Sequence, residues 1–223
     1  LLILNNISQN YKQGNESIRV LENLSIKIDK SYNVGLIGPS GSGKSTVLNL
    51  LGLLESPKKG SISINGHDCS SLNLEEKTNF RRKFIGFIFQ NNQLLEDFTC
   101  EENVALPLIL NGTPYKESII QAQDLLKKFG LDKRLKYKPS LLSGGEQQRV
   151  SVLRALIKKP LILLADEPTG SLDEKNAKIV FEQILNISKV QKTLCITATH
   201  NMKLLKYFDL SLKIEKGKLI EIR

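Results

Sequence analysis

A glycine-rich stretch from Gly38 to Thr46 has the residue types and spacing of a phosphate-binding loop. It reads Gly-Pro-Ser-Gly-Ser-Gly-Lys-Ser-Thr and fits the pattern G-x-x-x-x-G-K-[ST]. The glycines allow backbone N–H groups to turn toward phosphate oxygens, Lys44 supplies a positive charge for the outer phosphates, and Ser45 offers a hydroxyl to Mg²⁺. The alternative is a glycine-rich turn with a purely structural role, but such a turn would not require the Lys-Ser pair.

Two adjacent acids, Asp166 and Glu167, follow the apolar run Leu161–Ala165. A carboxylate at the end of a buried strand is costly unless a cation or a proton transfer compensates for the burial. Asp166 is suited to bind Mg²⁺, and Glu167 is suited to polarise a water that attacks a γ-phosphate. The alternative, two solvated acids in a loop, would leave the metal expected at Ser45 without an acidic partner.

The sequence Ser-Gly-Gly-Glu at residues 143–146 could form a second anion site at the start of a helix. Ser143 and Glu146 also have the spacing of a capping box, so this stretch taken alone would be a helix cap. One phosphate loop is already present at Gly38–Thr46, and the second site is therefore spare. A spare half-site is what a protein needs if ATP is bound between two copies, so we expect a homodimer.

Strands with two different patterns position these residues. Alternating apolar and polar residues predict an antiparallel sheet, and short continuous apolar runs predict buried parallel strands that end at a functional rim. The alternating segments are Leu1–Ser8, Ile18–Ile28 and Ser61–Ile64; the continuous runs are Val34–Ile37, Phe84–Phe89, Leu161–Ala165 and Thr193–Thr197. Two final strands are expected around the Lys-Gly turn within residues 213–222.

Helices are predicted between these strands. One follows the glycine-rich loop over Thr46–Leu54, Thr99 and Glu102 form a capping box before Asn103–Leu110, and Thr113–Pro114 opens a helix toward Phe129. We therefore predict a helical insert over residues 91–140 within a single domain of residues 1–223. The predicted fold class is α/β: a phosphate-loop NTPase core with a mostly parallel sheet, an antiparallel β subdomain and the helical insert.

Composition narrows the function classes. The net charge of +9 is consistent with binding to nucleic acid, with binding to an anionic membrane surface, or with lysine-rich faces that are only solvated. The lysines are spread along the 223 residues, which favours solvated faces. The basic stretches 81–83 and 127–138 contain few aromatic residues, so nucleic-acid binding is not expected. No apolar run is long enough to cross a bilayer, no secretory leader is evident, and three widely spaced cysteines predict a reducing, cytosolic compartment.

The motifs together resemble those of ABC ATPases. Gly38–Thr46, the signature Leu142–Gln148, Leu161–Glu167 and His200 occur in the family's order, and the resemblance covers nearly the whole chain. It implies hydrolysis of MgATP to ADP and phosphate by two subunits that close on two ATP molecules and drive a separate membrane partner. It also implies that Gln90 senses Mg²⁺ and the attacking water, that His200 contacts the γ-phosphate, and that Ser171–Asp173 forms the D-loop.

Tyr11 stands where the family has an aromatic residue that stacks on adenine. The structural alternatives are a half-buried strand residue for Tyr11, an exposed strand-end amide for Gln90, and a satisfied polar residue after a strand for His200. The predicted site comprises catalytic Glu167, His200 and Gln90; metal-binding Ser45, Gln90 and Asp166; and ATP-binding Tyr11, Gly38, Pro39, Ser40, Gly41, Ser42, Gly43, Lys44, Ser45, Thr46, Ser143, Gly144, Gly145, Glu146 and Asp173.

Within the family, the segments 86–90, 94–108 and 164–170 resemble the ATPases of lipoprotein-releasing systems, with macrolide-exporter and cell-division ATPases related. The resemblance implies a peripheral protein on the cytoplasmic face of the inner membrane, bound to integral transporter subunits. Glu96, Ser171 and Asn201 replace the usual Pro, Asn and Asp, which leaves the transported cargo open. A soluble ABC protein acting on ribosomes or DNA usually has tandem ATPase domains or long insertions, and a phosphate-loop kinase or GTPase would leave the signature unexplained.

The membrane partner is predicted to dock on residues 91–110, because the segment after Gln90 is the first that can transmit its movement outward. This segment has more apolar residues than one short helix needs: Leu94, Leu95, Phe98, Val104, Leu106, Leu108 and Ile109. The alternative is that these side chains pack inward against Ile119, Leu125 and Leu126.

Overall fold

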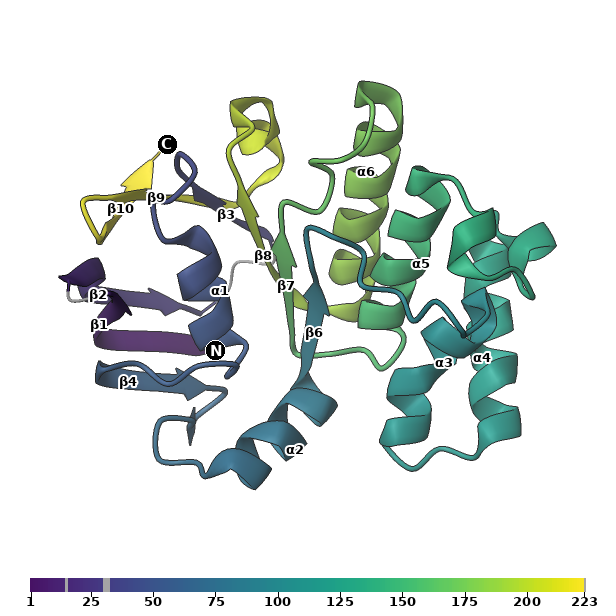
Figure 1. The fold of residues 1–223 in the computed structure, drawn as a ribbon, viewed down its shortest axis with the longest axis horizontal. Coiled ribbons are helices and arrows are strands. Elements are labelled where there is room, and N and C mark those ends of the chain that lie inside the picture. Colours follow the sequence, from purple (N-terminus) through teal and green to yellow (C-terminus); the bar gives the residue numbers. More distant parts are fainter. Residues whose placement is uncertain (15, 30–32, 223) are drawn as a thin grey trace. The chain divides into compact units, whose positions relative to one another are not determined.

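The computed structural model describes residues 1–14, 16–29 and 33–222, and the chain divides into two compact units (Figure 1). The first unit contains residues 1–81 and 194–223, and the second contains residues 82–193. The glycine-rich loop and His200 belong to the first unit. Gln90, the signature and the paired acids belong to the second.

The first unit contains the predicted antiparallel sheet. Its strands lie in the order β2-β1-β4-β5 and comprise β1 (Leu2–Gln13), β2 (Glu16–Ile28), β4 (Lys59–Ile64) and β5 (His67–Asp68). Alternation along β1 buries Leu2, Leu4 and Ile7, whereas Ile3 stays 40% exposed. The prediction of an antiparallel β subdomain is confirmed.

The parallel strands of the first unit place two predicted site residues side by side. Strand β3 (Asn33–Ile37) pairs in parallel with β8 (Leu194–Thr199) on one side and with β9 (Leu210–Glu215) on the other, and β10 (Lys218–Ile222) closes the edge in antiparallel fashion. Ile37 lies opposite Thr199 in this register. Gly38 and His200 therefore leave the sheet at neighbouring strand ends.

Three helical segments complete the described part of the first unit. Helix α1 (Lys44–Leu51) begins where the glycine-rich loop ends, and the 3-10 helix η3 (Met202–Tyr207) follows His200. Helix α2 (Leu74–Phe84) was not predicted from the sequence. Phe80 is its one buried residue, so the helix has no apolar stripe that a periodicity analysis could detect.

The second unit contains two parallel strands and four helices, of which α5 packs on β6 and α3 packs on α4 and α5. Strand β6 (Ile85–Ile88) lies beside β7 (Ile162–Asp166), with Ile88 opposite Ala165. The helices are α3 (Cys100–Leu110), α4 (Tyr115–Lys128), α5 (Gly144–Leu156) and α6 (Glu174–Gln191), with 3-10 turns η1 (Asp132–Arg134) and η2 (Pro139–Leu141) before α5. A Cβ at Gly86 would lie 2.5 Å from the carbonyl oxygen of Ala155, so β6 and α5 approach closely.

Several predicted boundaries were wrong by a few residues. Helix α1 starts two residues earlier than Thr46 and ends before Leu54, Phe84 belongs to α2, and β8 continues past Thr197 to Thr199. Helices α3 and α4 lie within the predicted insert, but α3 also packs on α5, beyond residue 140. The limits of the insert and the single-domain assignment stay predictions.

Across the described residues, no helix combines the length and the apolar composition that crossing a membrane requires.

Candidate functional site

The glycine-rich loop of the first unit turns tightly between β3 and α1. Gly41 has a φ of 77° and Gly43 a φ of 102°, both in the left-handed region that favours glycine. A Cβ at Gly43 would lie 2.9 Å from Cγ1 of Val20. The loop therefore requires glycine at position 43 for its backbone conformation and for the space around it.

Lys44 and the start of α1 give this loop groups that suit an anion. Lys44 is only 7% exposed, and its Nζ atom donates to the carbonyl oxygens of Gly38 (2.8 Å) and Pro39 (3.0 Å). Gly43 occupies the cap position and provides no side chain for the first N–H groups of α1, which lie at the positive end of the helix dipole. The Ser42 hydroxyl is buried and has no hydrogen-bond partner among the described residues. These groups fit the oxygens of a nucleotide's phosphates.

Asn201, the residue after the predicted γ-phosphate contact His200, has a structural role. His200 is exposed and directly follows β8. Asn201 donates its backbone N–H to the Thr199 hydroxyl (3.1 Å) and accepts the N–H of Lys203 at its side chain (3.0 Å), which caps η3. Asparagine and aspartate cap helices about equally well, so the departure from the usual Asp retains the local structure.

Tyr11 lies on β1 in the same unit as the phosphate loop. Its side chain is 37% exposed, and its hydroxyl donates a hydrogen bond of 2.6 Å to the carboxylate of Glu55. The sequence alone does not predict a role for Glu55. Its single carboxylate, 44 residues from Tyr11, belongs to no recognisable motif.

In the second unit, the parallel register brings Gln90 and the two acids to neighbouring strand ends. Asp166 is the last residue of β7, and Gln90 follows β6 by two residues. Glu167 has a φ of 42°, and its carbonyl oxygen accepts the N–H of Gly170 (3.0 Å) in a tight turn. A non-glycine residue with positive φ is uncommon, and here it forms part of the turn that follows β7.

The signature begins α5 with the predicted capping box. The Ser143 hydroxyl accepts the N–H of Glu146 (3.3 Å), and the Glu146 carboxylate accepts the N–H of Ser143 (2.8 Å). Arg134 donates a further hydrogen bond to Glu146 (2.9 Å). Burial raises the pKa of Glu146, but the hydrogen bonds from Ser143 and Arg134 outweigh burial, and the pKa lies below its ordinary value.

The D-loop lies against the signature glycines. A Cβ at Gly144 would be 3.9 Å from Leu172, and a Cβ at Gly145 would be 3.4 Å from the side chain of Asn176. Asp173 caps α6: its carboxylate accepts the N–H (3.1 Å) and the side-chain amide (2.6 Å) of Asn176, and these bonds lower its pKa. Asp173 therefore has a structural role here, and its predicted contact with ATP stays a prediction.

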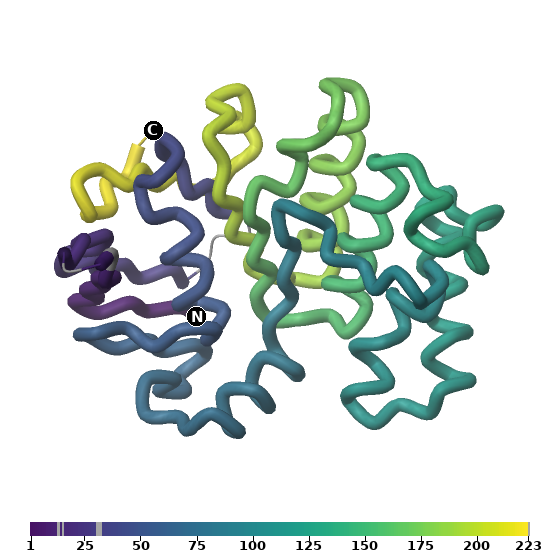
Figure 2. Tube along the Cα trace, viewed as in Figure 1, coloured from purple at the N-terminus to yellow at the C-terminus, as the bar shows by residue number. Residues whose placement is uncertain are grey.

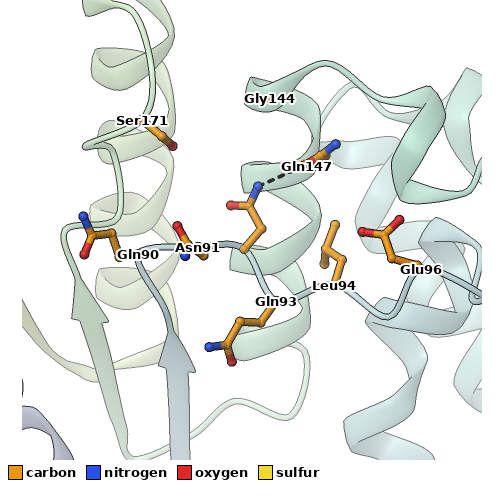
Figure 3. A pocket seen from close by; sticks show the side chains of 9 residues that line it. Gln90, Asn91, Gln93, Leu94, Glu96, Gly144, Gln147 and Ser171 are labelled. Carbon is orange, nitrogen blue, oxygen red and sulfur yellow. Dashed lines mark hydrogen bonds between the residues drawn. The ribbon is translucent and has the colours of Figure 1, made fainter.

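A pocket of about 430 Å³ opens between the segment after β6, the start of α5 and the D-loop (Figure 3). Gln90, Asn91 and Ser171 lie on one side, and Leu94 and Glu96 on the other. The side-chain amide of Asn92 donates a hydrogen bond to the side-chain oxygen of Gln147 in α5 (3.3 Å). Polar side chains from three motifs thus line one cavity within this unit.

Side chains of helix α5 also form hydrogen bonds with the backbone of the segment after Gln90. In Figure 2 this segment passes in front of α5 on its way to α3. Arg154 donates to the carbonyl oxygens of Asn92 (2.9 Å) and Gln93 (2.8 Å), and the Ser151 hydroxyl donates to Asn92 (3.2 Å). Gln147, Ser151 and Arg154 are spaced four and three apart, so they share one face of the helix. The signature helix and the segment after Gln90 are therefore mechanically joined.

Comparison with known proteins identifies the family. The family described as "ABC transporter" matches residues 21–170. The chain is an ABC transporter ATPase. A matching solved structure, entitled a dimeric post-hydrolysis state of the ATP-binding cassette MJ0796 bound to ADP and Pi, covers 100% of this chain and 98% of its own, with a TM-score of 0.91 and 34% identity.

Curated relatives of this ABC ATPase match it over nearly its full length. A protein of Rickettsia bellii named lipoprotein-releasing system ATP-binding protein LolD is 45% identical, over 98% of this chain and 97% of the relative. The protein of the same name in Nitrobacter winogradskyi is 41% identical, over 98% and 94%. The predicted α/β fold and ATPase activity are thereby confirmed.

The oxygen donors of this ABC ATPase suit Mg²⁺ bound together with a nucleotide. Within the described ranges, no group of three or more His, Cys, Asp or Glu side chains could hold a metal ion. Magnesium is typically held by one or two carboxylates plus substrate phosphates, and the second unit offers the carboxylate of Asp166. The hydroxyl of Ser45 and the amide of Gln90 are further oxygen donors, and their predicted role in binding Mg²⁺ stays a prediction.

Proposed function

We propose that this ABC ATPase is the ATP-hydrolysing subunit of a lipoprotein-releasing transporter. It acts as a homodimer on the cytoplasmic face of the inner membrane and energises separate integral membrane subunits. The observation that carries the proposal is the full-length similarity to relatives named for lipoprotein release. The sequence also resembles macrolide-exporter and cell-division ATPases. The tests below distinguish these alternative functions from lipoprotein release.

The proposed chemistry assigns separate roles to the two units' residues. The loop Gly38–Thr46 binds the phosphates, with Lys44 on the outer oxygens and Tyr11 against the base. Ser45, Gln90 and Asp166 would hold Mg²⁺, which neutralises charge on the β- and γ-phosphates when bound. Glu167 polarises the attacking water, and His200 contacts the γ-phosphate.

In the proposed dimer, the signature residues 143–146 of one copy complete the ATP site of the other. Two observations support this role. The solved dimers of the cassette MJ0796 are related to this chain over its full length, and the start of α5 presents backbone N–H groups that the phosphate loop of the same chain does not need. Each ATP is then bound by two subunits, and hydrolysis releases them.

Exposed apolar side chains support docking of the membrane partner on residues 91–110. Leu95 is 41% and Phe98 is 37% exposed. Asn103 fixes the backbone beneath them, because its side chain donates to the carbonyl oxygens of Leu95 and Phe98 (both 3.1 Å). Val104 is fully buried, so the expectation that it contributes to the docking surface was wrong. Leu95 and Phe98 are the anchors of the proposed surface.

Charge substitutions at Leu95 and Phe98 test the membrane partner. The variants Leu95→Glu and Phe98→Glu should keep basal ATP hydrolysis but lose co-purification with the integral partner from detergent-solubilised membranes. Ile120→Glu, on the exposed face of α4, is the matched control and should keep both. Unchanged co-purification would place the docking surface elsewhere.

Identifying the membrane partner would show which cargo the transporter moves. Reconstitution of the co-purified complex in vesicles that carry an acylated protein should give ATP-dependent release of that protein, and Glu167→Gln should abolish release while ATP still binds. A partner that exports a macrolide or joins a division complex, with no release of acylated protein, would contradict lipoprotein release but not the ATPase mechanism.

A further inference from the structure

The carboxylate of Glu55 accepts hydrogen bonds from three side chains. Its Oε2 atom accepts from the Tyr11 hydroxyl (2.6 Å) and, at longer range, from the Gln9 amide (3.4 Å), and its Oε1 atom accepts from the Asn49 amide (3.0 Å). Gln9 and Tyr11 belong to β1, Asn49 belongs to α1, and Glu55 follows α1. All four residues lie in the unit that contains the phosphate loop.

The donors around Glu55 are themselves held in place. Gln9 is only 4% exposed, and its Oε1 atom accepts the N–H of Lys58 (3.0 Å), which directs the amide nitrogen toward Glu55. Asn49 lies in the second turn of α1, the helix that starts at Lys44. The carboxylate therefore joins β1 to the helix that begins at the phosphate loop.

This network fixes one end of Tyr11 and leaves part of its ring accessible. The hydroxyl is anchored at Glu55, whereas 37% of the side chain remains exposed. Burial raises the pKa of Tyr11, the hydrogen bond to Glu55 raises it further, and the side chains of Thr46 and Gln9 act in the opposite direction. The phenol thus stays protonated at neutral pH and keeps donating to the carboxylate.

A ring held in this way could bind a flat base at a fixed distance from the phosphates. Base–aromatic stacking depends on the ring face and tolerates different bases, but its strength depends on the orientation of the ring. A freely rotating tyrosine would lose entropy on binding, whereas an anchored ring is already in position.

We propose that Glu55 is a positioning residue for the nucleobase: it holds the Tyr11 ring in the orientation that stacks on the base of a nucleoside triphosphate bound at Gly38–Thr46. This inference rests on the proposed base-stacking role of Tyr11. Glu55 touches neither the base nor the phosphates and acts through the tyrosine alone.

The test compares ATP with inorganic tripolyphosphate, which has the phosphates but no base. Calorimetric dissociation constants are measured for Tyr11→Ala, Tyr11→Phe, Glu55→Ala, Glu55→Gln and the double variant Tyr11→Phe/Glu55→Ala. Tyr11→Ala should weaken ATP binding roughly tenfold through loss of stacking. Glu55→Ala and Tyr11→Phe should each weaken it roughly threefold, and the double variant no more than either, because both remove the same hydrogen bond.

Glu55→Gln keeps an acceptor oxygen and should restore ATP binding to near the wild-type value. Tripolyphosphate binding should be unchanged in every variant, and Glu75→Ala, an exposed carboxylate of α2, is the matched control. Additive losses in the double variant, or equal losses for tripolyphosphate, would show that Glu55 only supports the fold and would overturn the inference. An unchanged ATP affinity in Tyr11→Ala would instead refute the base-stacking role itself, and the inference with it.

Discussion

The starts of helices α1 and α5 are both glycine-rich, but their N–H groups are satisfied in different ways. At α1 the cap residue is Gly43, in a left-handed conformation and without a side-chain cap. At α5 the cap residue is Ser143, with a complete capping box and an additional hydrogen bond from Arg134 to Glu146. The start of α1 has no side-chain cap, whereas the start of α5 is capped by its own side chains.

We propose that the two starts bind phosphate with different strength. The uncapped N–H groups of α1, with the buried side chain of Lys44, would form a strong anion site that belongs to one chain. The start of α5 already has internal partners, so it would be preformed but bind an anion more weakly. Weak binding of this kind suits a signature that contacts ATP only after the phosphate loop of another copy has bound the ATP.

Replacing one glycine at each helix start by alanine should give the largest difference between the two starts, measured as a loss in the free energy of unfolding. Gly43→Ala places a Cβ 2.9 Å from Val20 at a φ of 102° and should destabilise the protein by roughly 3 kcal/mol. Gly145→Ala places a Cβ 3.4 Å from Asn176, and the gain in helix propensity offsets this contact within about 1 kcal/mol. Denaturant unfolding measures both. Equal losses of stability in the two variants would contradict the difference between the two helix starts.

The second largest difference between the two helix starts should appear in the stabilisation of the protein by ATP. At a hundredfold excess over its dissociation constant, ATP should stabilise the wild-type chain by about 2.7 kcal/mol. Lys44→Ala should lose most of this stabilisation, because the ammonium is part of the loop's anion site, whereas Ser143→Ala in the monomer should keep it. Thermal unfolding with and without ATP reports the difference, and retained stabilisation in Lys44→Ala would argue against the loop as the primary site.

The smallest expected effect is the pH dependence of the cap at α5. Because the folded pKa of Glu146 lies below its ordinary value of 4.5, its stabilising effect is present above that pH and is lost as the pH falls through the lower, folded pKa. Glu146→Gln should cost about 1 kcal/mol at neutral pH, and the difference from wild type should shrink in acid. A difference that stays constant down to acid pH would show that the charge is not involved. Glu75→Gln is the exposed control.

The sequence predicted most elements whose side chains carry a clear local pattern. The antiparallel strands alternate, β3 and β7 are continuous apolar runs, and the capping boxes at Thr99 and Ser143 start helices where expected. Helix α2 was missed because a helix with one buried residue depends on its own cap, Asn73 with Glu76, rather than on an apolar stripe.

The residues that support the motifs could not be predicted, because their partners are distant in sequence. Glu55 meets Tyr11 across 44 residues, and Arg154 meets Gln93 across 61. Such pairs depend on how strands and helices pack. Gln147, Ser151 and Arg154 share one face of α5, but other polar residues surround them in the sequence, and nothing there indicates their partner.

Complementation between two inactive variants tests the central claim, that the loop of one copy and the signature of another form one ATP site. Lys44→Ala impairs the loop and Ser143→Arg impairs the signature, so each homodimer should be inactive. A mixed dimer has one site with both lesions and one site with neither, and its ATP hydrolysis should recover part of the wild-type rate. No recovery in mixed dimers isolated with two different affinity tags would contradict the account, because loop and signature would then act within one chain.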